Sequence, residues 1–121
     1  MSTLIHTYTI DPKDVAAFEG TTIHPVCSTY TLAREIEFAT RQHIFDLKQD
    51  SEEGIGIHLS IDHLSPAHVG ETITITSSID SFSNGNLTCN YDVKVGDRLI
   101  AQGQTGQKIL PRDIIQKIFS N

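Results

Sequence analysis

The chain has 121 residues, the size of one domain, and a formal net charge of −6. This acidic balance argues against a nucleic-acid-binding or membrane-binding surface, because both need clustered Lys and Arg. With 38% hydrophobic and 20% charged residues, a soluble globular protein is expected. No apolar run approaches the roughly 20 residues of a membrane span, and residues 1–10 lack the pattern of a signal peptide. We therefore expect a cytoplasmic protein.

The N-terminal segment is predicted to form a strand and a short helix. Residues 3–10 alternate between polar and apolar, which is typical of a strand with one buried face. Asp11-Pro12 predicts a helix start, because Asp caps helices and Pro suits their first position. That short helix is predicted to end at Gly20 and to be followed by a connector over residues 21–26.

A long amphipathic helix is predicted from about Ser28 to about Gln49, with Ser28 or Thr29 as its N-cap. At roughly 100° per residue, one sector about 120° wide collects most of the apolar positions. The predicted stripe consists of Val26, Thr29, Tyr30, Ala33, Ile36, Glu37, Thr40, Ile44 and Leu47. It is expected to be buried, and Glu37 lies near its middle.

The rest of the chain is predicted to be a sheet with a short C-terminal helix after Pro111. Alternating polar and apolar residues predict four strands, over residues 57–63, 73–79, 87–95 and 98–110. Asn84-Gly85 and Gly96-Asp97 are typical of tight turns, so these strands should be antiparallel. One long helix is covered only if the sheet wraps around it, so we predict an α+β hotdog fold in a single domain, residues 1–121.

Glu37 is the strongest candidate for chemistry. A buried carboxylate costs several kcal/mol unless it is paired, hydrogen-bonded or protonated, and functional sites use such groups as general bases or nucleophiles. The alternative is a residue at the helix edge that reaches water. His63 ends a strand face that is otherwise apolar, so it is either a satisfied core or rim residue or a member of the same site.

Thr29 is either the N-cap of the helix or a hydroxyl that positions a ligand or water. On one helix, Thr29 and Glu37 would lie roughly 12 Å apart. They would share a site only if the ligand spans that distance, if the chain bends, or if a second subunit supplies one of them. Gly56 interrupts a strand pattern, which indicates a close backbone approach by a ligand or another chain.

No metal site is predicted, because the alternation of the strand directs His58 and His63 to opposite faces. Cys27 and Cys89 are too few for a disulfide framework and are predicted to be ordinary half-buried thiols. Cys27 directly precedes a helix start, where a thiolate can be stabilised, so a nucleophilic role is the weaker alternative.

These residues resemble the hotdog thioesterases related to fluoroacetyl-CoA thioesterase. The likeness runs from about Thr7 to Asp113 and is clearest over residues 27–39 and 56–64. That family uses a Thr, a Glu eight residues later and a His twenty-six residues after the Glu, and Thr29, Glu37 and His63 match this spacing. Gly56 matches a family Gly seven residues before the His.

The resemblance implies hydrolysis of a small acyl-CoA thioester by a homodimer, with active sites at the subunit interface; further pairing into tetramers stays open. Glu37 would be a general base on water or a nucleophile, and His63 would orient or polarise the reacting groups. Thr29 would position the acyl group or water. The Gly56 N–H or the helix N-terminus would hold the thioester oxygen. No cofactor is implied, because CoA enters as part of the substrate.

Two other activities stay open on this fold: an acyl-CoA hydratase or dehydratase, and a non-enzymatic module that binds acyl-CoA or a small ligand. Two stretches also differ from the family pattern. Residues 20–23 read Gly-Thr-Thr-Ile where the fluoroacetyl-specific enzyme has an aromatic lid, which argues against selectivity for fluoroacetyl-CoA. Residues 103–108 carry no His or Arg where relatives tend to have both, which leaves Lys108 as the candidate contact to the CoA phosphates.

Overall fold

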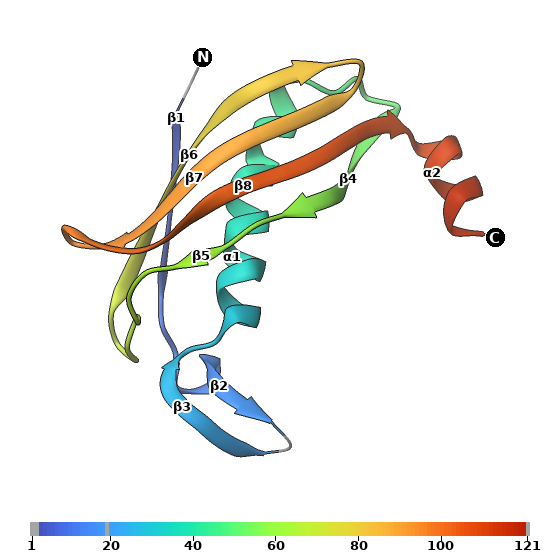
Figure 1. The fold of residues 1–121 in the computed structure, drawn as a ribbon. Coiled ribbons are helices and arrows are strands. Elements are labelled where there is room, and N and C mark those ends of the chain that lie inside the picture. The colour runs from blue at the N-terminus through green and yellow to red at the C-terminus, as the bar shows by residue number, and fades with distance from the viewer. Residues whose placement is uncertain (1–2, 19, 121) are drawn as a thin grey trace.

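A curved antiparallel sheet wraps around one long helix in the computed structural model of the chain, which describes residues 3–18 and 20–120 (Figure 1). The strand order is β1-β6-β7-β8-β4, and β5 also pairs with β8. The bounds are β1 Thr3–Thr9, β4 Glu52–Leu59, β5 Asp62–His63, β6 Thr72–Ser83, β7 Asn86–Val95 and β8 Arg98–Pro111. The predicted α+β hotdog fold is confirmed.

The predicted tight turns are present in this sheet. Asn84 and Gly85 both have positive φ, 52° and 78°, which suits a two-residue hairpin between β6 and β7. Gly96 has a φ of 58° in the turn between β7 and β8. Within the described ranges, β4 ends the sheet and pairs only with β8, so its other side is an unpaired edge.

The predicted long helix consists of α1 (Thr29–Arg41) and a following 3-10 helix, η2 (Gln42–Asp46). Ser28 is its N-cap, because the Ser28 hydroxyl accepts a hydrogen bond of 3.0 Å from the Thr31 N–H. A second helix, α2 (Arg112–Phe119), follows β8 and projects beyond the sheet (Figure 1). None of the helices in the described part of the chain is long and apolar enough to cross a membrane.

The predicted short helix before Gly20 is wrong. Asp11 does cap a helical turn, but this turn is only the 3-10 helix η1 (Pro12–Asp14). The following residues form a hairpin of β2 (Val15–Phe18) and β3 (Thr21–Cys27), which lies beside the start of α1 (Figure 1). Pairing with the β-branched residues of β3 outweighs the local helix start signal, and Gly20 supplies a positive φ of 80°.

The face of α1 that packs against the sheet differs from the predicted stripe by about a third of a turn. Its buried residues are Thr31, Leu32, Glu35, Ile36, Ala39 and Thr40. Glu37 and Thr29 are exposed, so the predicted burial of Glu37 is wrong for the single chain. The buried carboxylate of α1 is Glu35 instead, because His6 and Arg34 both pair with it.

Candidate active site

Thr29 and His63 lie together at the start of α1. Thr29 Oγ1 is 3.2 Å from His63 Nε2, within hydrogen-bond distance. Ser28 performs the capping, so the Thr29 hydroxyl is not needed to satisfy the helix end. Both side chains line a cavity of about 390 Å3 between β3 and the segment that follows β5. This pair can hold a polar group or a water at the mouth of the cavity.

Glu37 and Gly56 lie together further along the helix. A Cβ atom placed on Gly56 would stand 3.3 Å from Glu37 Oε2, so the carboxylate lies directly over the backbone of β4. Both residues line a cavity of about 130 Å3, together with Thr105 and Gln107 of β8. An exposed carboxylate beside a small polar cavity can act as a general base on water.

The structure therefore forms two pairs, Thr29 with His63 and Glu37 with Gly56, rather than one cluster. Eight helical residues separate Thr29 from Glu37, which corresponds to roughly 12 Å along the axis. Lys108, the candidate phosphate contact, lies on β8 opposite Ile55 of β4. Within one chain, a single reacting atom cannot contact both pairs at once.

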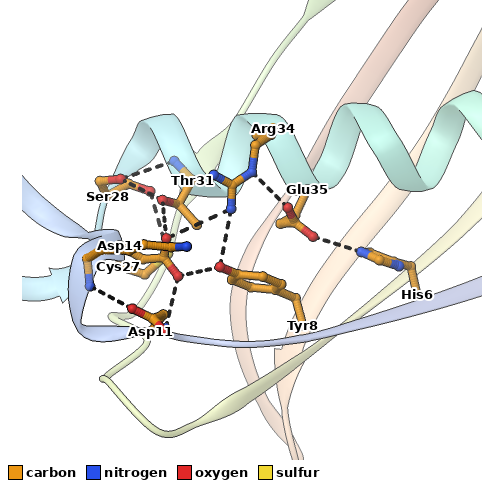
Figure 2. A network of polar contacts seen from close by, with 10 residues as sticks. His6, Tyr8, Asp11, Asp14, Cys27, Ser28, Thr31, Arg34 and Glu35 are labelled. Carbon is orange, nitrogen blue, oxygen red and sulfur yellow. Dashed lines mark hydrogen bonds and ion pairs between the residues drawn. The ribbon is translucent and has the colours of Figure 1, made fainter.

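A polar network holds the start of α1 against β1 and η1 (Figure 2). Asp14, which is buried, accepts hydrogen bonds from the Tyr8 hydroxyl at 2.5 Å and from the Asp11 N–H at 2.9 Å. Its backbone carbonyl accepts a hydrogen bond of 2.8 Å from the N–H of Ser28, and its carboxylate one of 3.4 Å from the Thr31 hydroxyl. Asp14 thereby holds Ser28, the residue before Thr29, both directly through the Ser28 N–H and indirectly through Thr31.

Arg34 joins this network to the buried carboxylate. Its Nε donates to Glu35 Oε2 at 2.9 Å, and its guanidinium lies 5.5 Å from the centre of the Tyr8 ring. His6 Nε2 is 2.9 Å from the other oxygen of Glu35 (Figure 2). Burial opposes the charge on Asp14, but the hydrogen bonds and Arg34 outweigh it, so the pKa of Asp14 is lowered. The network therefore stabilises the charged form of Asp14.

Cys27 lines the same cavity as Thr29 and His63, but its thiol is buried. Burial, with a smaller contribution from the Asp14 charge, raises the pKa of Cys27 to about 11. A raised pKa favours the protonated thiol at neutral pH, which argues against the nucleophilic alternative. Among residues 3–18 and 20–120, no three His, Cys, Asp or Glu side chains converge to form a metal site.

The residues that surround these pairs have no distinguishing signal in the sequence. Thr105 and Gln107 read as ordinary strand residues, and only their pairing opposite β4 brings them beside Glu37. Asp14 read as part of a helix that does not form. Phe18 was assigned to that same helix, yet it lies on the β2–β3 hairpin with its side chain exposed. No signal in the local sequence pattern distinguishes these positions.

The model of a protein family, fluoroacetyl-CoA-specific thioesterase, matches residues 10–113. The chain belongs to this family. A thioesterase superfamily member from Thermus thermophilus is 25% identical and has a TM-score of 0.93, over 98% of this chain and 88% of its own. No curated protein matches the chain in a sequence comparison.

Two further solved structures share the fold. The fluoroacetyl-CoA thioesterase FlK is 16% identical, with a TM-score of 0.88 over 99% of this chain and 94% of its own. A hot-dog-like protein from Thermanaerovibrio acidaminovorans is 12% identical, with a TM-score of 0.87 over 98% and 87%. The family and the fold thus agree with the resemblance found in the sequence.

Proposed function

We propose that the protein hydrolyses a small acyl-CoA thioester to the free acid and CoA. The observation that carries this proposal is the position of Glu37, whose carboxylate lies beside the Gly56 backbone and a small polar cavity. Membership of a thioesterase family supports the reaction class. A variant of FlK in complex with fluoroacetate and CoA supports a CoA ester as the kind of ligand.

In the proposed reaction, Glu37 removes a proton from water as the water oxygen attacks the thioester carbonyl carbon. The oxygen of that carbonyl gains negative charge, which the Gly56 N–H or the amides at the start of α1 would stabilise. The C–S bond then breaks, and the CoA sulfur leaves as a thiolate that takes up the proton. Thr29 and His63 would position the acyl group. No metal or cofactor takes part in this scheme.

We also propose that the active protein is a homodimer whose sites combine residues of two chains. The exposed face of α1 carries two aromatic side chains, Tyr30 with 75% of its surface accessible and Phe38 with 52%. Ile57 is exposed on the neighbouring edge strand β4. A second chain covering this apolar face would bring its own Thr29–His63 pair to Glu37, because a two-fold interface uses the same surface twice.

Release of CoA thiol from short, branched and aromatic acyl-CoAs tests the reaction. Wild type should turn over at least one of them, and Glu37→Gln should lower kcat by about 10²–10⁴-fold. Asp97→Asn, in the exposed turn between β7 and β8, is the matched control and should keep full activity. An unchanged rate in Glu37→Gln would contradict the assignment of Glu37.

The same assay separates the two alternative functions. An enoyl-CoA is added to the panel for this purpose: loss of its double bond without thiol release would identify a hydratase. Binding of acyl-CoA without any turnover would identify a binding module.

Subunit mixing tests the shared site. Glu37→Gln and His63→Ala should each be inactive, and random mixing should restore about a quarter of wild-type activity, because half the dimers hold one intact site. No recovery in dimers shown to have exchanged subunits would mean that each site lies within one chain.

A further inference from the structure

We infer that Thr105 and Gln107 bind the attacking water and hold it against Glu37. This inference rests on the proposed hydrolysis and assigns a place to the second substrate of that reaction, water itself. It also supports the role of Glu37 as general base, because a water held between these groups is already in position to be deprotonated. Three observations carry it: an unpaired buried hydroxyl, the size of the cavity, and the local shape of the sheet.

Thr105 Oγ1 is the one buried side-chain oxygen or nitrogen without a hydrogen-bond partner in the described part of the chain. Only 3% of the Thr105 surface is exposed. Burying a hydroxyl without a partner costs about 1–3 kcal/mol, so such groups need an explanation. Cys89 faces Thr105 across β7 and β8 and its thiol interacts with the Thr105 hydroxyl, but a thiol is only a weak hydrogen-bond partner and leaves the hydroxyl able to bind a better one. A water molecule in the adjoining cavity would supply the missing hydrogen-bond partner, and the hydroxyl would then serve to bind that water.

The cavity beside Thr105 is the one that Glu37, Gly56 and Gln107 also line. Its volume is about 130 Å3, whereas pockets for drug-sized ligands begin near roughly 300 Å3. A water molecule takes up about 30 Å3 in the liquid and needs two to four polar partners to be held. The cavity is therefore too small for the body of an acyl-CoA and large enough for a few waters. Hydroxyl, amide and carboxylate groups supply the partners.

The backbone keeps this space open. Gly56 has no side chain to fill it, and a Cβ there would point at Glu37 Oε2. Gly106 lets β8 approach β4 closely, because a Cβ there would stand only 3.0 Å from His58 Cβ. The register of β4 on β8 shifts between Gly56 and His58, so Ile57 has no partner on β8. Such irregularities bend a strand locally. Glu37, which is exposed, also lines this space, so a thioester can approach from the solvent side.

The resulting step balances without another reactant. The held water gives one proton to Glu37, and its oxygen forms a bond to the carbonyl carbon. The Thr105 hydroxyl accepts a hydrogen bond from that water, and the Gln107 amide provides a second contact. When the C–S bond breaks, the proton on Glu37 passes to the CoA thiolate. The products are one carboxylic acid and one free thiol.

Thr105→Val removes the hydroxyl and almost preserves the shape of the side chain. Its kcat should fall at least about tenfold while KM for the acyl-CoA changes less than about twofold, because the acyl-CoA is still bound but the water is misplaced. Thr105→Ser keeps a hydroxyl and should keep most of the activity. Thr74→Val, on the outer face of β6, is the matched control and should leave both constants unchanged. Gln107→Met should repeat the kcat defect.

Stability distinguishes a water site from a purely structural hydroxyl. If Thr105 were simply an unpaired group, Thr105→Val would leave kcat unchanged and raise or maintain the melting temperature. That result, obtained together with an inactive Glu37→Gln, would overturn the inference and leave the proposed function intact. Full activity in Glu37→Gln would instead overturn the proposed function. Reduced kcat in Thr105→Val with activity recovered in Thr105→Ser would support both.

Discussion

The hydroxyl of Thr29 lies 3.2 Å from Nε2 of His63, although 34 positions separate the two residues in the chain. The hydroxyl of the adjacent Ser28 caps the helix, whereas the hydroxyl of Thr29 contacts His63. Thr29→Val should lower kcat by about tenfold or more and leave the melting temperature nearly unchanged. Ser28→Ala should lower the unfolding free energy by about 1 kcal/mol. Steady-state kinetics and urea denaturation of both variants test this, and a stability loss in Thr29→Val would contradict it.

Gly56→Ala tests the contact between β4 and Glu37. The added Cβ would lie 3.3 Å from Glu37 Oε2, a tighter approach than most Cβ contacts, so the carboxylate must move by a few tenths of an ångström. We expect kcat to fall about tenfold or more, since small displacements of catalytic groups lower rates strongly. The matched control is Gly70→Ala, which has open space around its Cβ but a φ of 87°. It should lose stability and retain its kcat.

His43 makes the stability of the fold depend on pH. It is buried on the 3-10 helix η2 and hydrogen-bonds to the Ser77 hydroxyl at 3.0 Å. Burial lowers the pKa of His43, although Ser77 and Asp46 act in the opposite direction. The unfolded chain therefore binds the proton more readily below about pH 6.5, and stability must fall as the pH drops through that value.

Urea denaturation at pH 7.5 and pH 5.5 measures this effect. One such group changes the unfolding free energy by at most about 1.4 kcal/mol per pH unit. His43→Gln should lower stability at both values and reduce the difference between them. His68→Gln, which replaces an exposed imidazole, should keep the wild-type difference. An equal pH dependence in wild type and His43→Gln would contradict the assignment.

Asp14 should be the most sensitive position of the network in Figure 2. Asp14→Asn keeps the shape but leaves the Tyr8 hydroxyl and the Asp11 N–H with a weaker, uncharged partner. We expect a loss of about 1–3 kcal/mol in unfolding free energy at pH 7. Because the pKa of Asp14 is lowered in the fold, this contribution is present above about pH 4 and is lost as the pH falls further. The measurement is the unfolding free energy of wild type and Asp14→Asn as a function of pH. The two values should converge below about pH 4.

The sequence pattern predicted the helix and the sheet because both depend on long, regular alternation. It failed where tertiary contacts decide the structure. The start signal at Asp11 predicted a helix, but β3 offers Val15 and its neighbours a strand partner that no local rule detects. The buried face of α1 and η2 was misplaced because Glu35 and His43 are polar, yet each is buried with a partner on a strand, His6 of β1 and Ser77 of β6.

In the candidate site, too, some residues could be predicted from the sequence and others depended on tertiary contacts. The resemblance to the thioesterase family pointed to Thr29, Glu37 and His63, and the structure places Thr29 with His63 as a hydrogen-bonded pair. The separation of Glu37 from that pair was anticipated from helix geometry alone. Thr105 and Gln107 could not be found in this way, because only the register of β8 against β4 brings them beside Glu37.

The free edge of β4 has a practical consequence for any assay of this protein. An unpaired strand exposes a row of N–H and C=O groups that favours association with another strand. If the proposed dimer covers that edge, dilution into an assay would uncover it and separate the residues that the two chains contribute to each proposed site. Specific activity should then decrease at low enzyme concentration and recover when the diluted enzyme is concentrated again. Rates measured at a single dilution would report the association equilibrium as much as the chemistry.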